Sequence, residues 1–332
     1  MSIRAAERSS PARRGLLLLV PFLIFVLVFG LARYASSVGV DSSAQESNPF
    51  ADRTQFTWTG SAARQAAESA SGTDRAVLER LAGVPTGIWL TPEAHPPGSV
   101  GEFVTGIVRA ADEAGKVPVL VVYGISDRDC IDGESSGGLP PDQYEEWVEQ
   151  IAEAAGTESV AILEPDALAT AEECDQLDQR TELLGDAVDR LVDGGPTVYV
   201  DAGHASWTDP GVMASMLSAV GVDKARGFST NVSGYESDED EAAYAEAVSS
   251  ALTSPTHWVI DTSRNGAGSN GEWCNPAGRA LGQEPDHVSA GGLDARLWIK
   301  PPGESDGTCG GGPGAGEFWT ERALELARNA GW

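Results

Sequence analysis

The sequence predicts an α/β fold of the (β/α) barrel type, and two patterns carry this prediction. First, apolar runs typical of buried parallel strands alternate with helical stretches. Second, four of these runs lead into an aspartate and a turn, at Asp129, Asp166, Asp201 and Asp306. Because the strand carboxyl ends build the active site of such a barrel, we expect these carboxylates to gather at one mouth.

The alternation begins near residue 60 and gives seven strands. They are expected at 87–90, 117–123, 159–165, 197–201, 227–231, 258–261 and 296–300. Helical stretches between and after them are expected near 98–115, 141–155, 171–193, 209–220, 238–252 and 317–330. No repeat or second domain is visible, so the sequence indicates one large catalytic-type domain over residues 61–332.

The N-terminus has a different composition. Four arginines among residues 1–14 precede an almost wholly apolar run at 16–32. This pattern predicts a signal anchor or a cleaved signal peptide over residues 1–34, with the rest of the chain exported. Residues 35–60 are polar and lack apolar periodicity, which is typical of a spacer. We therefore expect an extracellular protein, secreted or anchored to the cell membrane by residues 16–32.

The composition narrows the partners. The formal net charge of the 332 residues is −28, and Lys116, Lys224 and Lys300 are the only lysines. So large an excess of acid argues against nucleic acid or an anionic lipid surface, and favours an uncharged substrate. Adaptation to high salt is a further explanation of the acidity, whereas the scarcity of lysine beside arginine can also reflect genome base composition. We expect a monomer.

The four cysteines all lie in the expected exported part, at positions 130, 174, 274 and 309. An even number in an oxidising compartment predicts two disulfides. No C-x-x-C spacing occurs and the histidines are scattered, so a zinc site is not expected. We expect no metal or cofactor.

Each acidic position also has a structural explanation. Asp166 could cap a helix starting in the segment that follows it, and Asp129 could form a surface ion pair with Arg128. Asp306 lies in a long glycine-rich loop and could simply be solvated. The functional alternative is that neighbouring carboxylates raise one another's pKa, which is how proteins keep one acid protonated near neutrality for glycosidic-bond hydrolysis.

Other polar and aromatic residues allow two interpretations as well. Trp89, Trp207 and Trp273 stand in polar or turn segments; each alone suits core packing, but could be a flat platform for a sugar ring. His204 could be held by a hydrogen bond in its turn. Asn231 begins a glycosylation sequon, but its place at a strand end favours a buried polar contact.

Taken together, these segments resemble glycoside hydrolase family 6, the cellulases that include endoglucanases and cellobiohydrolases. The resemblance covers roughly residues 60–332 in order. It is carried by GIW at 87–89, VLVVYGISDRDC at 119–130, SSGG at 135–138, ILEPDALA at 162–169, YVDAGHASW at 199–207, STNVSGY at 229–235, VIDTSRNG at 259–266, EWCNPAGRALG at 272–282 and LWIKPPGESDGTC at 297–309.

The resemblance implies a distorted seven-stranded (β/α) barrel that hydrolyses β-1,4-glucosidic bonds with inversion. It implies that Asp166 is the general acid and that Asp129 raises the pKa of Asp166 and helps to organise the attacking water. Asp306 matches the proposed catalytic base, and Asp201 matches a further carboxylate in the cleft.

The same resemblance implies the binding residues and the disulfides. Substrate contacts are implied for Trp89, Tyr123, Ser136, His204, Trp207, Asn231, Trp273, Lys300 and Glu304. The three tryptophans among them match sugar-stacking platforms, and the implied disulfides pair Cys130 with Cys174 and Cys274 with Cys309.

Two departures from the family pattern, Asp127 and Asn275, are expected to leave the acid and the base untouched. The loops between the motifs are short, which favours an open cleft and cleavage of internal bonds of cellulose or a related β-glucan. The alternatives are a cellobiohydrolase that acts from chain ends and a surface glycan-binding protein without activity.

Overall fold

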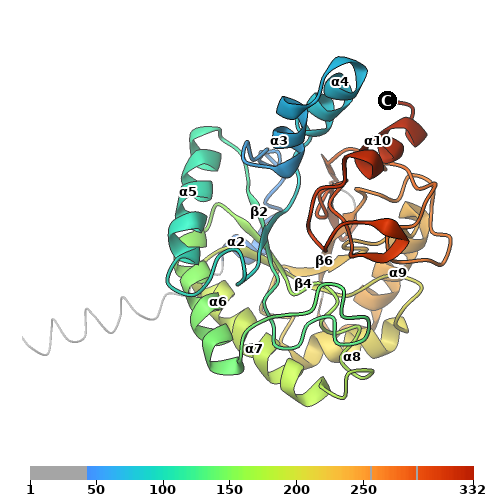
Figure 1. Ribbon diagram of the computed structural model, residues 1–332. Coiled ribbons are helices and arrows are strands. Elements are labelled where there is room, and N and C mark those ends of the chain that lie inside the picture. The colour runs from blue at the N-terminus through green and yellow to red at the C-terminus, as the bar shows by residue number, and fades with distance from the viewer. Residues whose placement is uncertain (1–42, 255, 289–290) are drawn as a thin grey trace, which may run out of the picture. The chain divides into compact units, whose positions relative to one another are not determined.

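The computed structural model describes residues 43–254, 256–288 and 291–332, and within them one curled sheet is surrounded by helices (Figure 1). The strands are β1 (Ile88–Leu90), β2 (Val119–Val122), β3 (Val160–Leu163), β4 (Thr197–Asp201), β5 (Gly227–Thr230), β6 (His257–Asp261), β7 (Asp286–His287) and β8 (Leu293–Leu297). The helices are α2 (Ser43–Glu46), α3 (Ala62–Ser69), α4 (Gly72–Leu81), α5 (Val100–Glu113), α6 (Pro141–Ala155), α7 (Leu177–Gly194), α8 (Pro210–Ala219), α9 (Asp238–Ala251) and α10 (Thr320–Asn329), with the 3₁₀ turn η1 (Cys309–Gly311).

The sheet follows the chain, in the order β1-β2-β3-β4-β5-β6-β8-β7. All neighbours pair in parallel except the two-residue β7, which pairs antiparallel with β8. The predicted α/β fold with seven parallel strands is therefore confirmed. The last parallel strand begins three residues earlier than expected, at Leu293, because Leu293 already pairs with Trp258 of β6.

The residues after β8 turn toward β1. The Gly87 N–H donates to the Trp298 carbonyl at 2.8 Å, and the Trp89 indole N–H donates to the Ile299 carbonyl at 3.0 Å. Gly87 is required here, because a Cβ would lie 2.4 Å from the Ile299 oxygen. The barrel is distorted because these contacts, and no regular ladder among the described residues, join β1 to the segment after β8.

Side chains along the strands alternate between two apolar layers. Val119 and Val121 of β2 point into the barrel, where they join a buried cluster with Tyr199 of β4. Leu120 and Val122 point outward and join the larger cluster beneath the surrounding helices. Strands buried on both faces explain why these segments read as continuous apolar runs in the sequence.

Helix α7 begins six residues later than predicted. Residues 167–175 form turns instead, and the left-handed backbone of Asp175, with φ of 54°, interrupts a helix there. The residue preceding α7 is Gln176. The alternative that Asp166 caps this helix is therefore wrong, which leaves the Asp166 carboxyl available to the strand end.

Helices α3 and α4 were not expected, and they lie beside α10 (Figure 1). Leu78 and Leu81 of α4 pack with Leu326 of α10 and Trp298 in a third buried cluster. The short amphipathic helices before β1 thus cover the place where the chain passes from β8 to α10.

The structure also differs from the expected spacer at 35–60, because its described part, from residue 43, packs on the barrel. Phe50 is only 3 % exposed and belongs to the cluster inside the barrel. The Gln45 side chain accepts the N–H groups of Val198 and Arg226, each at 3.0 Å, at the starts of β4 and β5. This segment therefore closes the amino-terminal end of the barrel, and its polar composition reflects hydrogen bonds to strand ends.

The predicted disulfides Cys130–Cys174 and Cys274–Cys309 are confirmed. The expected signal anchor or signal peptide lies outside the described residues. Within the part of the chain that the structure describes, no helix combines the length and apolar character needed to cross a bilayer.

Candidate active site

The carboxyl ends of the strands carry the predicted acids around a cavity of about 460 Å³. Asp129, Asp166 and Asp306 line this cavity, together with His204, Trp207 and Trp273. Asp201, the last residue of β4, lies beneath it and is buried. The four aspartates that the sequence singled out thus meet at one mouth of the barrel.

Asp166 follows β3 in the left-handed backbone region, with φ of 69°. Its N–H donates to Asp201 Oδ2 at 2.9 Å, and the Gly203 N–H donates to the same oxygen at 3.0 Å. Burial raises the pKa of Asp166 well above its ordinary value, and the charges of Asp201 and then Asp129 raise it further. The site therefore favours a protonated Asp166 near neutral pH.

Asp201 shares this environment. Burial raises the pKa of Asp201 to about 7, against the lowering effect of the Asp166 and Gly203 N–H groups. The Ser229 hydroxyl also donates to Asp201 Oδ1 at 3.2 Å. Asp166 and Asp201 form a coupled pair of carboxyls, and ionisation of one opposes ionisation of the other.

Asp129 belongs to a hydrogen-bonded chain on the β2 side of the cavity. Its Oδ2 accepts the Ser135 N–H at 2.6 Å and the Ser135 hydroxyl at 3.1 Å. The Ser135 hydroxyl also lies 2.9 Å from the Tyr123 hydroxyl. The Cys130–Cys174 disulfide anchors the loop directly after Asp129. Tyr123, Ser135 and Asp129 therefore form one connected chain of polar groups.

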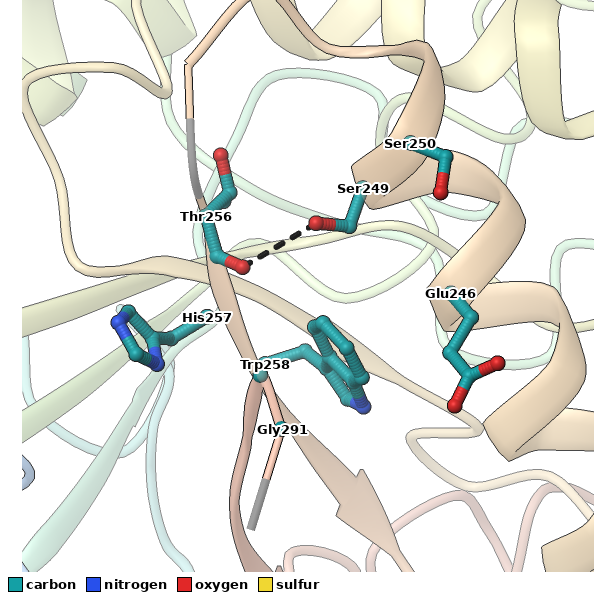
Figure 2. A pocket seen from close by; sticks show the side chains of 8 residues that line it. Glu246, Ser249, Ser250, Thr256, His257, Trp258 and Gly291 are labelled. Atoms are coloured by element: carbon teal, nitrogen blue, oxygen red, sulfur yellow. Dashed lines mark hydrogen bonds between the residues drawn. The ribbon is translucent and has the colours of Figure 1, made fainter.

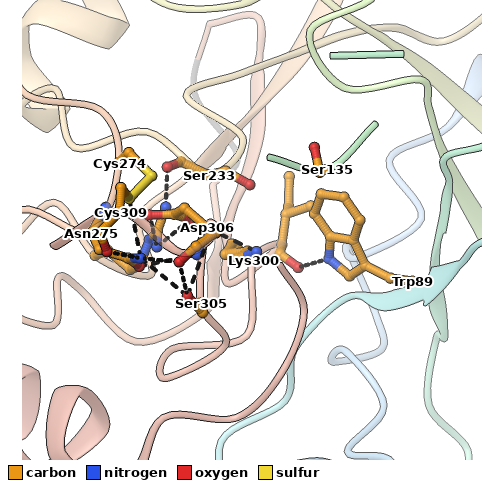
Figure 3. A network of polar contacts seen from close by, with 12 residues as sticks. Trp89, Ser135, Ser233, Cys274, Asn275, Lys300, Ser305, Asp306 and Cys309 are labelled. Atoms are coloured by element: carbon orange, nitrogen blue, oxygen red, sulfur yellow. Dashed lines mark hydrogen bonds and ion pairs between the residues drawn. A yellow bond between two sulfur atoms is a disulfide. The ribbon is translucent and has the colours of Figure 1, made fainter. Parts of the chain in front are cut away.

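Asp306 lies in an opposite electrostatic environment (Figure 3). Its carboxylate accepts Arg264 Nη1 at 2.8 and 3.0 Å, the Tyr235 hydroxyl at 3.0 Å and the Asn275 N–H at 3.0 Å, and Lys300 Nζ lies 3.8 Å from Oδ1. Burial would raise the pKa of Asp306, but Arg264 and Lys300 outweigh it and the pKa is lowered. Asp306 therefore stays ionised.

Three comparisons with known proteins agree with this geometry. The family model described as glycosyl hydrolases family 6 matches residues 46–330.

The chain belongs to glycosyl hydrolase family 6.

Endoglucanase A of Cellulomonas fimi is 46 % identical over 269 residues, which cover 80 % of this chain and 59 % of that protein. Endoglucanase 1 of Streptomyces halstedii is 40 % identical over 275 residues, which cover 79 % of this chain and 84 % of that protein. The endoglucanase Cel6 of Mycobacterium tuberculosis, solved in complex with methyl-cellobiosyl-4-deoxy-4-thio-β-D-cellobioside, superimposes with a TM-score of 0.81 at 45 % identity, over 86 % of this chain and 100 % of that chain. This chain thus spans about three fifths of the length of the C. fimi protein.

Lys300 lies between Asp306 and Trp89 of β1 (Figure 3). The Trp89 ring meets Tyr123 edge-on with centroids 5.2 Å apart, and Lys300 Nζ lies 5.3 Å from the centre of the Trp89 ring. Glu304 is near Lys300, and burial raises its pKa to about 7 against the charges of Lys300 and Arg264. These three predicted contacts form a second group of residues beside the cavity.

The predicted tryptophans differ in exposure, but none is fully buried. Trp273 is 48 % exposed, whereas Trp89 and Trp207 are partly exposed. The Trp207 ring lies 5.2 Å from the His204 ring, centroid to centroid, and both line the cavity. Each of the three therefore presents some aromatic surface to solvent.

Two predicted binding residues occupy other positions. Asn231 is 0 % exposed, and its amide donates to the carbonyls of Glu236 and Asp261 and accepts the Glu236 N–H. It braces the loop instead of lining the cavity, as a left-handed residue with φ of 61°. Ser136 is exposed, and it is Ser135 that contacts Tyr123 and Asp129, because the turn after Asp129 points the preceding serine inward.

Three side chains around Asp306 were not predicted to contact it. Arg264 and Tyr235 fall inside matched motifs, but nothing in their spacing indicated a contact with a residue 40 or more positions later. Asn275 was expected to leave the base untouched, and this was wrong. Its N–H donates to Asp306, and its side-chain oxygen accepts the Asp306 N–H at 3.0 Å.

A second cavity, of about 420 Å³, lies at the amino end of β6 against α9 (Figure 2). Glu246 is the only carboxylate among its described lining residues, which also include Ser249, His257 and Trp258. It has no pair of acids and lies at the opposite end of β6 from the aspartate cluster. Asp129, Asp166 and Asp306 line the first cavity and not this one.

The described residues offer one group with metal-ligand spacing, formed by Glu134, Cys274 and Cys309. The two sulfur atoms are bonded to each other, so neither is a free thiolate. Glu134 accepts the Thr308 N–H at 2.6 Å and thereby fastens the Asp306 loop. We therefore interpret this group as a set of contacts that holds the loops together.

Proposed function

We propose that this protein is an exported, inverting β-1,4-endoglucanase that uses Asp166 as its general acid. The observation that carries the proposal is the position of Asp166, a strand-end carboxyl in an open cavity whose pKa is raised by burial and by the charges of Asp201 and Asp129. The cavity has aromatic walls and a row of carboxylates, which is the equipment for glycosidic-bond hydrolysis.

The neutral carboxyl of Asp166 donates its proton to the glycosidic oxygen as the bond to the anomeric carbon breaks. Its raised pKa matches this task, because a general acid has to be protonated at the working pH. The backbone N–H of Asp166 is held by Asp201, so the strand end is fixed while the carboxyl faces the cavity. Asp201 acts through Asp166 and does not contact the substrate in this mechanism.

A water molecule attacks the anomeric carbon from the opposite face. We assign its orientation to the Tyr123, Ser135 and Asp129 chain, and its proton passes to Asp129. Asp129 Oδ1 accepts no hydrogen bond among the described residues, whereas both oxygens of Asp306 accept strong donors. A carboxylate whose pKa is lowered by two cations is a weak proton acceptor. Asp306 instead supplies fixed negative charge opposite the positive charge that develops on the sugar.

An uncharged β-1,4-glucan suits this cavity best. Its described wall carries Asp132, Glu173, Glu236 and Glu272 in addition to the three aspartates, and no lysine or arginine. A polymer with negative groups would be repelled, whereas glucose rings can stack on Trp207 and Trp273. The cello-oligosaccharide analogue bound to the M. tuberculosis relative supports this substrate class.

Cleavage of internal bonds is supported by the form of the cavity and by the relatives. Trp273 and Ile131 both line the cavity and are about half exposed, so a long chain can enter from the side. The C. fimi, S. halstedii and M. tuberculosis proteins are all named endoglucanases. We also propose that residues 16–32 direct export and that residues 61–332 contain the catalytic machinery.

Incubation of the full-length protein with hydroxyethylcellulose tests the proposal. We expect solution viscosity to fall steeply while few reducing ends appear, and the new ends to have the α-configuration by NMR. Reducing ends without a fall in viscosity would indicate attack from chain ends, as in a cellobiohydrolase. If the polymer stays intact while the protein still binds it, a glycan-binding protein replaces the endoglucanase.

A further inference from the structure

Helix α9 contributes a buried carboxyl to the back of the active-site cavity. Its first turn contains Asp238, Glu239, Asp240 and Glu241, and acids at this position are favoured by the helix dipole. Glu239 and Asp240 are exposed, but Glu241 is 0 % exposed. Burial of a carboxyl costs free energy, so its partner identifies what it stabilises.

The partner is the loop that follows β4. Glu241 Oε1 accepts the Ala205 N–H at 2.8 Å. One helical turn later, the buried Tyr244 hydroxyl donates to the Ala202 carbonyl at 3.0 Å. Helix α9 therefore holds the loop at two points, on either side of Gly203 and His204.

This loop carries groups that the proposed mechanism needs. The Gly203 N–H donates to Asp201 Oδ2, the oxygen that also accepts the Asp166 N–H. His204 and Trp207 line the cavity, and Trp207 N–H donates to the His204 carbonyl at 3.0 Å. A displacement of Ala205 would move the aromatic wall and the support of the acid together.

The buried environment of the Glu241 carboxyl suits a side chain that acts as a structural hydrogen-bond acceptor. Burial raises its pKa to about 7, against the lowering effect of the Ala205 N–H, while Glu236 and Asp240 raise it further. Two further groups interact with its charge, Asp201 and Tyr244. A neutral carboxyl keeps its carbonyl oxygen as an acceptor and adds no repulsion toward Asp201.

We propose that Glu241 is a positioning residue that fixes the Ala202–Trp207 loop, and with it the aromatic wall of the cavity, against Asp201 and Asp166. The proposal rests on the proposed function for its kinetic consequences but not for its structural ones. Glu241 contacts no substrate in this arrangement and acts through the Ala205 N–H.

The test compares three variants of the full-length protein. E241Q keeps an oxygen acceptor of the same reach and should retain wild-type behaviour. E241D withdraws the acceptor by one methylene and should raise the exchange rate of the Ala205 amide about tenfold, the effect of losing roughly one buried hydrogen bond. E239Q, on the exposed side of the same helical turn, is the matched control.

The kinetic readout separates positioning from general stability. We expect E241D to raise KM for a soluble cello-oligosaccharide about tenfold with a smaller loss in kcat, because the wall that holds the sugar is displaced. Y244F should act in the same direction and more weakly, and it serves if E241D does not fold. Unchanged amide exchange and unchanged KM in E241D, or in Y244F if E241D is unfolded, would overturn the proposal.

Hydrogen exchange does not depend on catalysis, so the two proposals can fail separately. An inactive wild-type protein with a protected Ala205 amide that E241D exposes would remove the endoglucanase and leave the positioning role. An active wild-type enzyme whose E241D variant has normal amide exchange and a normal KM would remove the positioning role and leave the endoglucanase.

Discussion

The two sides of the cavity shift the pKa of a buried carboxylate in opposite directions. Around Asp166, burial and the charges of Asp201 and Asp129 outweigh the charge of Lys300, and the pKa is raised. Around Asp306, the charges of Arg264 and Lys300 outweigh burial, and the pKa is lowered. Burial alone would raise both, so the neighbours decide which carboxyl carries a proton. A proton donor and a permanent charge can therefore be set within one small cavity of a strongly acidic protein.

The largest expected effect comes from removing the acid. D166A should lower kcat on a glucan polymer by about 10²–10⁴-fold, because the leaving oxygen no longer receives a proton. An aryl cellobioside with a good leaving group should retain far more of its rate. D142N, at an exposed position on α6, is a control that should match the wild type. Equal losses on both substrates would mean that Asp166 supports the fold instead of donating the proton.

Removing the partner of Asp306, on the other side of the cavity, should lower the stability of the protein. R264M leaves Asp306 buried without its main partner, and we expect the free energy of unfolding to fall by about 3–5 kcal/mol in urea titrations. The double variant R264M/D306N removes the stranded charge and should recover part of that loss. If the double variant is no more stable than R264M, the ion pair is not what determines the cost.

The Cys274–Cys309 disulfide anchors the loops that carry Trp273 and Asp306, and it spans 35 positions. Replacing both cysteines by serine should lower the free energy of unfolding by about 2–4 kcal/mol, because the unfolded chain gains conformational freedom. The measurement is urea denaturation of the variant beside wild-type protein kept oxidised. A variant of wild-type stability would show that the Glu134–Thr308 contact and the Asp306 network suffice to hold these loops.

A smaller effect is expected in the pH profile of D201N. The Asp201 charge raises the pKa of Asp166, so removing it lowers that pKa and Asp166 loses its proton at lower pH. The alkaline limb of kcat/KM should therefore move toward lower pH, while S229A, which removes only a hydroxyl contact to Asp201, should move it less. A limb that stays in place, or moves upward, would contradict the coupling between the two acids.

The smallest effect concerns the acidic wall. At low salt, carboxymethylcellulose should be cleaved several-fold more slowly than hydroxyethylcellulose of similar substitution, and added salt should narrow the difference by screening. The double variant E173Q/E272Q should narrow it at low salt. If the ratio of the two cleavage rates changes neither with salt nor in the variant, these charges have no role in substrate choice.

Most of what could be predicted came from the regular pattern of apolar residues and from the position of acidic residues at strand ends. The continuous apolar runs of β2, β3 and β4 predicted the parallel sheet, and Asp166 and Asp201 could be found because each lies at the carboxyl end of a strand. Contacts made by irregular loops could not be found in this way. Asp129 and Asn275 have left-handed backbones that depend on tertiary partners, so nothing local showed that Ser135 would turn inward or that Asn275 would meet Asp306.

The described chain begins at the closed end of the barrel, where Gln45 and Phe50 fasten it beneath β4 and β5. The cavity opens at the other end of the same strands. The first described residues therefore lie at the base of the barrel, away from the cavity. Coupling a resin or a scaffold protein at the exposed Glu46 of this segment should leave the mouth of the barrel free for a long polymer, whereas coupling near Trp273 would obstruct it.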